Sequence, residues 1–270
     1  MNTELWIRLA VFASVIAAVA WWETQAPRRA RSVGRLARWP SNLAAVALNR
    51  VLIIAIVPAG AVGFAALCAG RGWGVMNLVR VPPGFALLAS VVVLDFVIYL
   101  QHVMFHAIPA LWRIHRMHHA DLDFDVTTGV RFHPLEILVS MGVKMAAVAA
   151  LGPTAAGVLA FEVILNATSM FNHANAAIPL PIDAILRLVV VTPDMHRVHH
   201  SVSVREANSN FGFSLPWWDR LLGTYRAQPA AGHSGMTIGI AEFRDAGELR
   251  LDRMLTQPWR GSIGDYSINR

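Results

Sequence analysis

The sequence has 270 residues, of which 55% are hydrophobic and only 15% charged, and its mean hydropathy is +0.47. Soluble domains carry about 25% charged residues, so this composition excludes an ordinary soluble protein and indicates a membrane protein. The net charge is +6, but arginines between apolar blocks supply nearly all of it, with Lys144 the single lysine. Since no nucleic-acid-binding module is recognisable either, we expect no nucleic-acid partner.

Three apolar blocks are long enough to cross a bilayer as helices of about 20 residues, and they cover residues 5–22, 51–69 and 84–100. The first block lacks the basic start and small-residue cleavage site of a signal peptide and ends in Trp21-Trp22, a typical interfacial anchor. We therefore interpret it as a retained span. The single cysteine, Cys68, lies in the second block and is expected to be a small buried hydrophobic residue.

A fourth apolar block, residues 135–170, is interrupted by Gly152-Pro153. It is too short for two full tilted spans and a wide loop, but its length fits a tight helical hairpin that enters and leaves the membrane on one side. Residues 182–191 follow as a candidate interfacial helix, and Trp217-Trp218 as a further interfacial anchor.

These elements predict an all-α, integral-membrane helical bundle of about three spans plus the hairpin, with a histidine-rich helical cap. We divide the chain into N-terminal spans with an arginine-rich loop (residues 1–83), a catalytic region (84–226) and a polar C-terminal tail (227–270).

The charges of the loops predict the orientation. The loop between the first two spans has no acidic residue after Glu23 and contains five arginines: Arg28, Arg29, Arg31, Arg35 and Arg38. The next loop has only Arg71 and Arg80. Cytoplasmic loops carry the excess of basic residues, so we expect the first loop to be cytoplasmic, in a bacterial-type inner membrane. Counting forward, the third span and the hairpin both end on that side.

Ten of the eleven histidines fall between residues 102 and 200. They form an HxxxH motif at the end of the third span, two HxxHH motifs and two single positions: His102, His106, His115, His118, His119, His133, His173, His196, His199 and His200. Helical positions i, i+3 and i+4 share one face, so each motif directs its imidazoles to one point.

The number of these imidazoles predicts two metal ions. One zinc site takes about four ligands, whereas the three motifs offer eight imidazoles and His173 a ninth. Imidazole binds iron, zinc and copper, so the residue type alone leaves the metal open. Buried imidazoles without partners would be costly at membrane depth, which disfavours chance as the origin of three motifs. The remaining histidine, His233, is expected to be a polar residue that reaches the interface.

Three segments resemble the fatty acid hydroxylase / sterol desaturase superfamily: HAIPALWRIHRMHH at residues 106–119, TPDMHRVHHS at 192–201, and NFG at 210–212 followed by LPWWDRLLGTY at 215–225. The resemblance covers residues 84–226, and the first motif has the shorter of the family's two spacings. It implies a non-haem di-iron enzyme with two iron ions, O2 as co-substrate and a separate electron-donor protein of the ferredoxin or cytochrome type. The ligands that it implies are His102, His106, His115, His118, His119, His173, His196, His199 and His200.

Five polar residues beside these motifs have roles that stay open. His133, with Pro134 and Glu136 next to it, suits a supporting role better than direct ligation. Three further residues are expected either to orient imidazoles through their second ring nitrogens or to act as loop or cap residues: Asn175, Asp194 and Asp219.

The resulting hypothesis is a membrane oxygenase that hydroxylates or desaturates a lipid-like substrate, with neither the lipid nor the choice of reaction fixed. A zinc-dependent membrane hydrolase would need an acidic base such as that of HExxH, which is absent. A metal transporter would place its ligands along the spans. A catalytically inactive lipid-binding member of the superfamily is the third alternative, because ligands alone do not establish turnover.

Overall fold

The computed structural model describes residues 3–79, 81–264, 266 and 268, and Arg80 of the second loop lies outside them. The regular structure of the described residues is helical, apart from two isolated β-bridges. Five helical segments are long and apolar enough to cross a membrane: α1 (Thr3–Gln25), the segment Arg35–Leu78, α5 (Pro83–Ala107), α7 (Pro134–Leu151) and α8 (Ala155–Asn172). The prediction of an all-α membrane bundle with three spans and a hairpin is confirmed.

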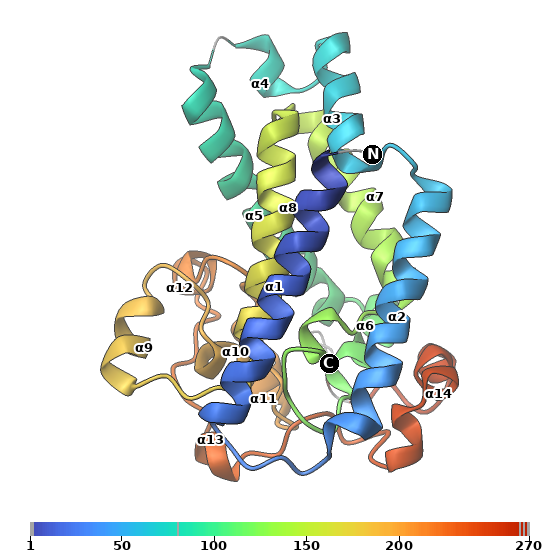
Figure 1. Ribbon diagram of the computed structural model, residues 1–270, viewed down its shortest axis with the longest axis vertical. Helices are drawn as coiled ribbons and strands as arrows, with labels where there is room; N and C mark the ends of the chain where they lie inside the picture. Colours follow the sequence, from blue (N-terminus) through green and yellow to red (C-terminus); the bar gives the residue numbers. More distant parts are fainter. Residues whose placement is uncertain (1–2, 80, 265, 267, 269–270) are drawn as a thin grey trace.

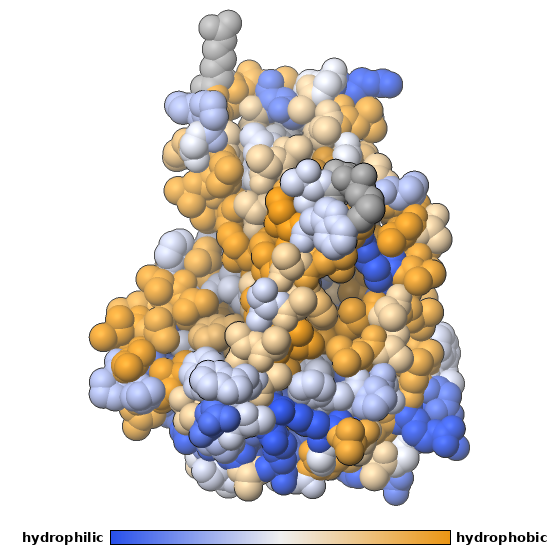
Figure 2. Space-filling model, in the orientation of Figure 1, coloured by the Kyte–Doolittle hydropathy of each residue, from blue (hydrophilic) through white to orange (hydrophobic). Residues whose placement is uncertain are grey.

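The bundle, which we define as these five segments, stands above a cap of short elements in the view of Figure 1. Within the bundle α8 packs against α1 and α5. The cap consists of α6 (Pro109–His119), η1 (Thr128–Val130), α9 (Leu180–Leu186), α10 (Pro193–His199), α11 (Val204–Ala207), α12 (Trp217–Leu221), α13 (Gly232–Gly235), η2 (Ala246–Leu249), α14 (Leu251–Thr256) and η3 (Gln257–Trp259). Hydrophobic residues cover most of the visible bundle surface, whereas hydrophilic residues gather at the lower end (Figure 2).

The second span differs from its predicted range of residues 51–69. The segment consists of α2 (Arg35–Ile56), α3 (Gly60–Arg71) and α4 (Val75–Leu78). The helix begins well before residue 51 because Arg38, Asn42 and Asn49 are buried on one side of α2, a polar face that a hydropathy window excludes. It breaks before Pro58, since proline disfavours helical backbone at the residue that precedes it.

The predicted hairpin is formed by α7 and α8, which α5 accompanies in the bundle core. Gly152 ends α7 in the left-handed conformation (φ 68°), and the Thr154 hydroxyl accepts a hydrogen bond from the Gly157 amide at the start of α8. The turn lies against Gly74, where a Cβ atom would be 2.2 Å from the Gly152 nitrogen. Glycine is therefore required at this contact, at the end of the bundle remote from the cap.

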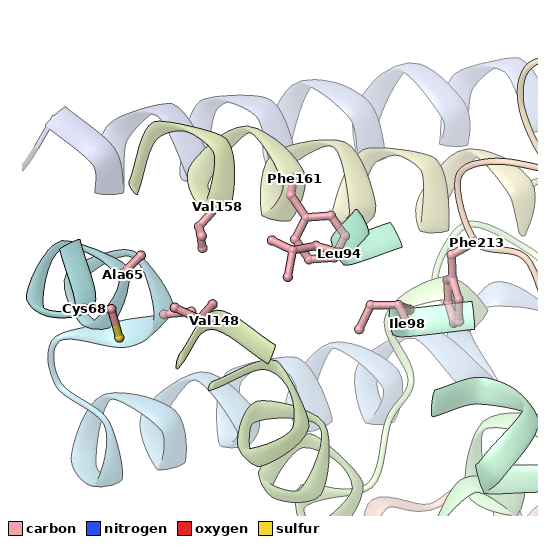
Figure 3. Close-up of a cluster of buried hydrophobic side chains, with 9 residues drawn as sticks. Ala65, Cys68, Leu94, Ile98, Val148, Val158, Phe161 and Phe213 are labelled. Carbon is pink, nitrogen blue, oxygen red and sulfur yellow. The ribbon is translucent and has the colours of Figure 1, made fainter. Parts of the chain in front are cut away.

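The hydrophobic core of the bundle lies where α3, α5, α7 and α8 meet (Figure 3). Leu94 and Phe161 are almost completely buried there, and Cys68 is fully buried. The expectation that Cys68 is a small buried hydrophobic residue is confirmed.

The C-terminal segment, predicted as a polar tail from residue 227, folds onto α6. Arg116 donates hydrogen bonds to the backbone carbonyls of Gln257, Arg260 and Ser262, and the Trp112 indole donates one to the Ile263 carbonyl at 3.2 Å. This segment therefore forms one side of the cap, while the division of the chain into domains stays a prediction.

Candidate metal centre

The nine histidines implied as ligands converge in two groups, within each of which the potential ligand atoms lie within 4.8 Å of one another. The five-histidine group consists of His102, His106, His115, His119 and His199. The four-histidine group consists of His118, His173, His196 and His200. All nine side chains are buried. The groups adjoin, because the His119 ring stacks on the His200 ring with centroids 4.5 Å apart.

Helix ends bring these side chains together. His102 and His106 are one turn apart on α5, which ends where Ile108 becomes extended before Pro109. Pro109 then begins α6, so the chain turns back and places the first HxxHH motif beside α5. On α10, which carries the second HxxHH motif, the Thr192 hydroxyl accepts a hydrogen bond from the Met195 amide and caps the helix. His173 lies directly after α8.

Backbone carbonyls fix the tautomer of three imidazoles. A carbonyl oxygen only accepts hydrogen bonds, so a neutral imidazole that contacts one through Nδ1 carries its proton there and keeps a lone pair on Nε2. The three contacts are His102 with Phe211 (2.7 Å), His173 with Ser169 (2.7 Å) and His199 with Ser209 (2.8 Å).

Side chains hold two more imidazoles in the same way. His115 Nδ1 lies 2.6 Å from the Glu136 carboxylate, so Glu136 supports an imidazole of the five-histidine group. His106 Nδ1 lies 3.1 Å from Asn208 Oδ1. The Asn208 amide nitrogen donates to the Tyr266 carbonyl at 3.0 Å, which orients the amide oxygen towards His106.

The Nε2 atoms inside each group are spaced as ligands of one ion would be. His102 and His115 are separated by 3.1 Å, and His106 and His119 by 3.2 Å. His173 Nε2 lies 3.1 Å from that of His200. Two nitrogens that bind one ion at about 2.1 Å and nearly at right angles are about 3.0 Å apart. Both ring nitrogens of His196 are buried without a hydrogen-bond partner, so a cation would satisfy the one that carries the lone pair.

Burial keeps these imidazoles neutral. It lowers the pKa well below the ordinary range for six of the histidines outside the spanning helices, and neighbouring imidazoles add to the effect: His115, His118, His119, His196, His199 and His200. Burial also lowers the pKa of His173 to about 3. Neutral imidazole is the form that binds metals, so the residues fit a pair of metal ions.

Aromatic rings surround the two groups. The His118 ring stacks on Phe132 with centroids 4.5 Å apart, and Phe105 and Phe124 stack on His115 and His173. Phe124 is completely buried and Phe105 almost so. These rings exclude water and leave few polar contacts that could compete with a bound ion.

His133 lies in neither group. Its Nδ1 accepts a hydrogen bond from the Leu135 amide and so caps α7, while its Nε2 lies 3.1 Å from the Leu255 carbonyl. Both ring nitrogens are thus engaged, and the residue joins α7 to the C-terminal segment. A supporting role for His133 stays a prediction.

Three residues expected to contact second ring nitrogens of the ligands have other polar partners. Asn175 exchanges hydrogen bonds with the Arg29 backbone, and Asp194 pairs with Arg28 and Arg197. Asp219 accepts hydrogen bonds from the backbone amides of residues 211 and 212 at 2.8 and 2.9 Å. Asp219 therefore positions the Phe211 carbonyl that holds His102, whereas Asn175 and Asp194 attach the arginine-rich loop to the cap.

The expectation for His233 was wrong. Its side chain is 4% exposed, and its Nε2 lies 3.4 Å from the Asp194 carboxylate. Burial lowers its pKa to about 4, although Asp194 raises it.

One network beside the metal centre was not predicted. The Arg38 guanidinium, completely buried, donates two hydrogen bonds to Asp121 at 2.7 and 2.8 Å and one to Asp125 at 2.6 Å. Burial raises the pKa of Asp121, but Arg38 and Arg131 outweigh this and hold it below the usual range. The alternating aspartates directly after His119 were the available signal, because unpaired carboxylates are rarely buried.

A cavity of about 570 Å³ reaches from the remote end of the bundle to the metal centre, where His102 and His115 line it. Charged residues of the spanning helices also line it, among them Arg8, Lys144 and Glu162. The sequence analysis assigned them no role, although ionisable residues inside spans are functional candidates by default.

Comparisons with known proteins identify the family. Over 160 residues the chain is 31% identical to the ornithine lipid hydroxylase OlsE of Rhizobium tropici, which covers 59% of this chain and 46% of that protein. It is 28% identical over 153 residues to the alkylglycerol monooxygenase of Homo sapiens and to that of Xenopus tropicalis, covering 55% of this chain and 32% of each.

The chain thus spans less than half the length of these curated relatives, and no solved structure matches it significantly. The family model described as fatty acid hydroxylase matches residues 87–224, just over half of the 270 residues. The match includes all nine clustered histidines and the 210–212 and 215–225 motifs up to residue 224. The chain therefore belongs to the fatty acid hydroxylase family, as its histidine motifs predicted.

Proposed function

We propose that this protein is a membrane-bound non-haem di-iron oxygenase that uses O2 and external electrons to hydroxylate a lipid. The nine clustered histidines would hold two iron ions, one in each group. The names of the relatives, a lipid hydroxylase and a monooxygenase, favour hydroxylation over desaturation. The family and the membrane-spanning helices support a lipid as substrate.

The arrangement of the imidazoles is the observation that carries the proposal. Two adjoining groups of five and four nitrogens exceed what one ion needs. Nδ1 contacts to carbonyl, carboxylate and amide oxygens turn the Nε2 lone pairs inward. An all-imidazole set fits iron, zinc and copper alike, so the family supplies the argument for iron.

Iron bound in the two groups would supply O2 activation and the oxidising power for an unactivated C–H bond. The chain's own residues perform the remaining tasks. Phe211, Ser209 and Ser169 hold the imidazoles through their carbonyls. The stacked phenylalanines exclude water, and the cavity admits an apolar substrate up to His102 and His115.

The position of the cap favours a cytoplasmic metal centre in a bacterial-type inner membrane. The arginine-rich loop lies at the same end of the bundle as α6 and α10 (Figure 1), and Arg28 and Arg29 contact the cap. Basic loops mark the cytoplasmic side. Electrons would come from a separate soluble or membrane carrier of the ferredoxin or cytochrome type. The orientation is tested by placing a cysteine at residue 30 and comparing its labelling in intact cells with its labelling in opened cells.

Metal analysis of the full-length protein in detergent tests the proposal. We expect two irons per chain and a hydroxylated lipid that disappears when O2 is withheld. His118→Ala and His199→Ala, one in each group, should abolish product and lower the iron content. His233→Gln, outside both groups, is the matched control and should keep both. Zinc as the resident metal, or full iron and product in both alanine variants, would refute the assignment.

A further inference from the structure

A cluster of charged side chains lies inside the bundle, away from the metal centre. Arg8 of α1 lies 2.6 Å from the Glu162 carboxylate of α8, and Lys144 of α7 lies 2.5 Å from its other oxygen. The Glu162 and Lys144 side chains are 9% and 12% exposed. Three spanning helices thus direct their charges to one point, and all three side chains line the 570 Å³ cavity.

These charges exceed what an internal ion pair requires. A charged residue inside a span is costly and is usually retained for a function. Glu162 is satisfied by two cations, and a single contact uses only one of the three N–H donors of Lys144. Arg50 of α2 lines the same cavity and has no ion pair among the residues that the structure describes. With Glu4, which pairs with Arg8, this part of the cavity holds three cations and two carboxylates, a net charge of +1.

The cluster is connected to the metal centre by two rows of side chains. On α7, Glu136, Ser140 and Lys144 follow one another at four-residue intervals and therefore lie on one face. Glu136 contacts His115, so the axial distance from the metal centre to Lys144 is about 12 Å, or eight residues of helix. On α8, Glu162, Asn166 and Ser169 line the cavity in the same manner above His173.

We propose that this cluster binds the anionic group, a carboxylate or a phosphate, of an acyl lipid whose hydrocarbon chain extends down the cavity to the metal centre. The inference rests on the proposed function and adds the chemical class of the substrate. Arg50, and the two N–H donors of Lys144 that its contact with Glu162 leaves unused, supply the positive charge for the anion. The lower cavity is lined by Ile98, Phe105 and Phe132, which suit an alkyl chain.

This arrangement also determines which carbon is oxidised. An anion fixed at the level of Lys144 places a chain carbon about 12 Å away beside the histidines. A lipid without a charged group would have no such fixed point and would slide along the apolar walls. Positioning by a remote contact is a common use of binding energy in enzymes.

Binding measurements on the full-length protein in a neutral detergent test the proposal without turnover. The probes are a long-chain fatty acid, its methyl ester and a monoalkyl phosphate of equal chain length, with acetate and inorganic phosphate as chain-free anions. We expect the fatty acid and the alkyl phosphate to bind at least about tenfold more tightly than the ester. The chain-free anions should compete only weakly.

Variants separate charge recognition from structural damage. Arg50→Gln and Lys144→Gln should each reduce the preference for the acid over the ester by about tenfold. Arg71→Gln, an exposed arginine of α3 that does not line the cavity, is the matched control and should leave it unchanged. Glu162→Gln should increase the preference, because it removes a negative charge, whereas a folding defect would decrease it.

Equal affinity for acid and ester, or an unchanged preference in both Arg50→Gln and Lys144→Gln, would overturn the proposal. Tight binding of inorganic phosphate without a chain would also overturn it, since it would show an anion site unrelated to lipids. The iron content of the same samples distinguishes a failure of the anion-binding proposal from a failure of the proposed oxygenase function. Two irons with no charge preference leave the oxygenase standing, and a charge preference without iron leaves only the binding site.

Discussion

The cap and the bundle treat buried charge in opposite ways. Where the bundle meets the cap, Arg38 of α2 is completely buried and contacts two carboxylates and a hydroxyl group of the cap, so the charges there are fully paired. In the interior of the bundle, Arg8, Lys144 and Glu162 lie beside a cavity, and the two cations keep some of their N–H donors unused. The comparison indicates that charge in the cap holds the metal centre rigid, whereas charge in the bundle is available to a ligand.

Acid should disrupt the cap most strongly. A histidine whose pKa is lower in the folded than in the unfolded state binds protons on unfolding, so stability falls as the pH drops below about 6.5. Burial lowers the pKa of His173 to about 3 and those of His196 and His200 well below 6.5. We expect nearly complete loss of metal at about pH 4, measured as metal retained after gel filtration. Full retention at that pH would show that protonation of the unfolded state does not destabilise the cap enough to release metal.

Arg38→Met should strongly destabilise the contact between α2 and the cap. It leaves Asp121 and Asp125 buried without their main partner, which costs about 3–5 kcal/mol, and thermal unfolding in detergent would measure the loss. Arg250→Gln is the matched control, because Arg250 and Asp252 form a solvent-exposed pair, and such pairs contribute little to stability. Equal effects of the two substitutions would show that burial does not distinguish them.

Gly157→Ala tests the packing of the bundle. A Cβ atom at Gly157 would lie 2.4 Å from the Ser90 Cβ, so α8 and α5 would have to separate, at a cost of about 1–3 kcal/mol. Gly142→Ala on α7 is the control, since nothing lies within 4 Å of its Cβ position. We expect Gly157→Ala to lower the unfolding temperature without changing the metal content. Loss of metal would show that the cap depends on this helix contact.

Asn208→Ala should have the smallest of these effects. It removes the acceptor that orients His106, and the loss of such a partner weakens metal binding by about tenfold or more, measured by competition with a chelator. Asn208→Asp keeps an oxygen acceptor and should retain most of the affinity. Equal affinity in both variants and the original chain would mean that Asn208 does not position His106.

The spans and the clustered histidines could be predicted because each depends on local pattern. Residues 84–100 form one apolar stretch and residues 135–170 form two, separated by Gly152-Pro153, and the HxxHH spacing places imidazoles on one helical face. The division of the nine histidines into a group of five and a group of four could not be predicted. His118 and His119 are neighbours in sequence yet belong to different groups, and only the crossing of α5, α6 and α10 decides which nitrogens meet.

Long-range polar contacts explain the remaining differences. The start of α2 at Arg35 depends on Arg38 and Asn42 meeting Asp121 and Thr127, which lie some eighty residues further along the chain. His233 was misplaced for the same reason, because its position beside Asp194 is set by the fold of the C-terminal segment and not by its neighbours in sequence.

The division of the ligands has a consequence for how the protein acquires its metal during synthesis. Four members of the five-histidine group emerge between residues 102 and 119, but the fifth is His199. The four-histidine group gains three of its members only from residue 173 onwards. Because ribosomes build the chain from the N-terminus, the five-histidine group is incomplete until His199 has been made and the four-histidine group until His200. Both histidine groups are therefore complete only after all five spans have been synthesised. Under the proposed function, binding of metal in both groups would then require that the whole bundle has been assembled.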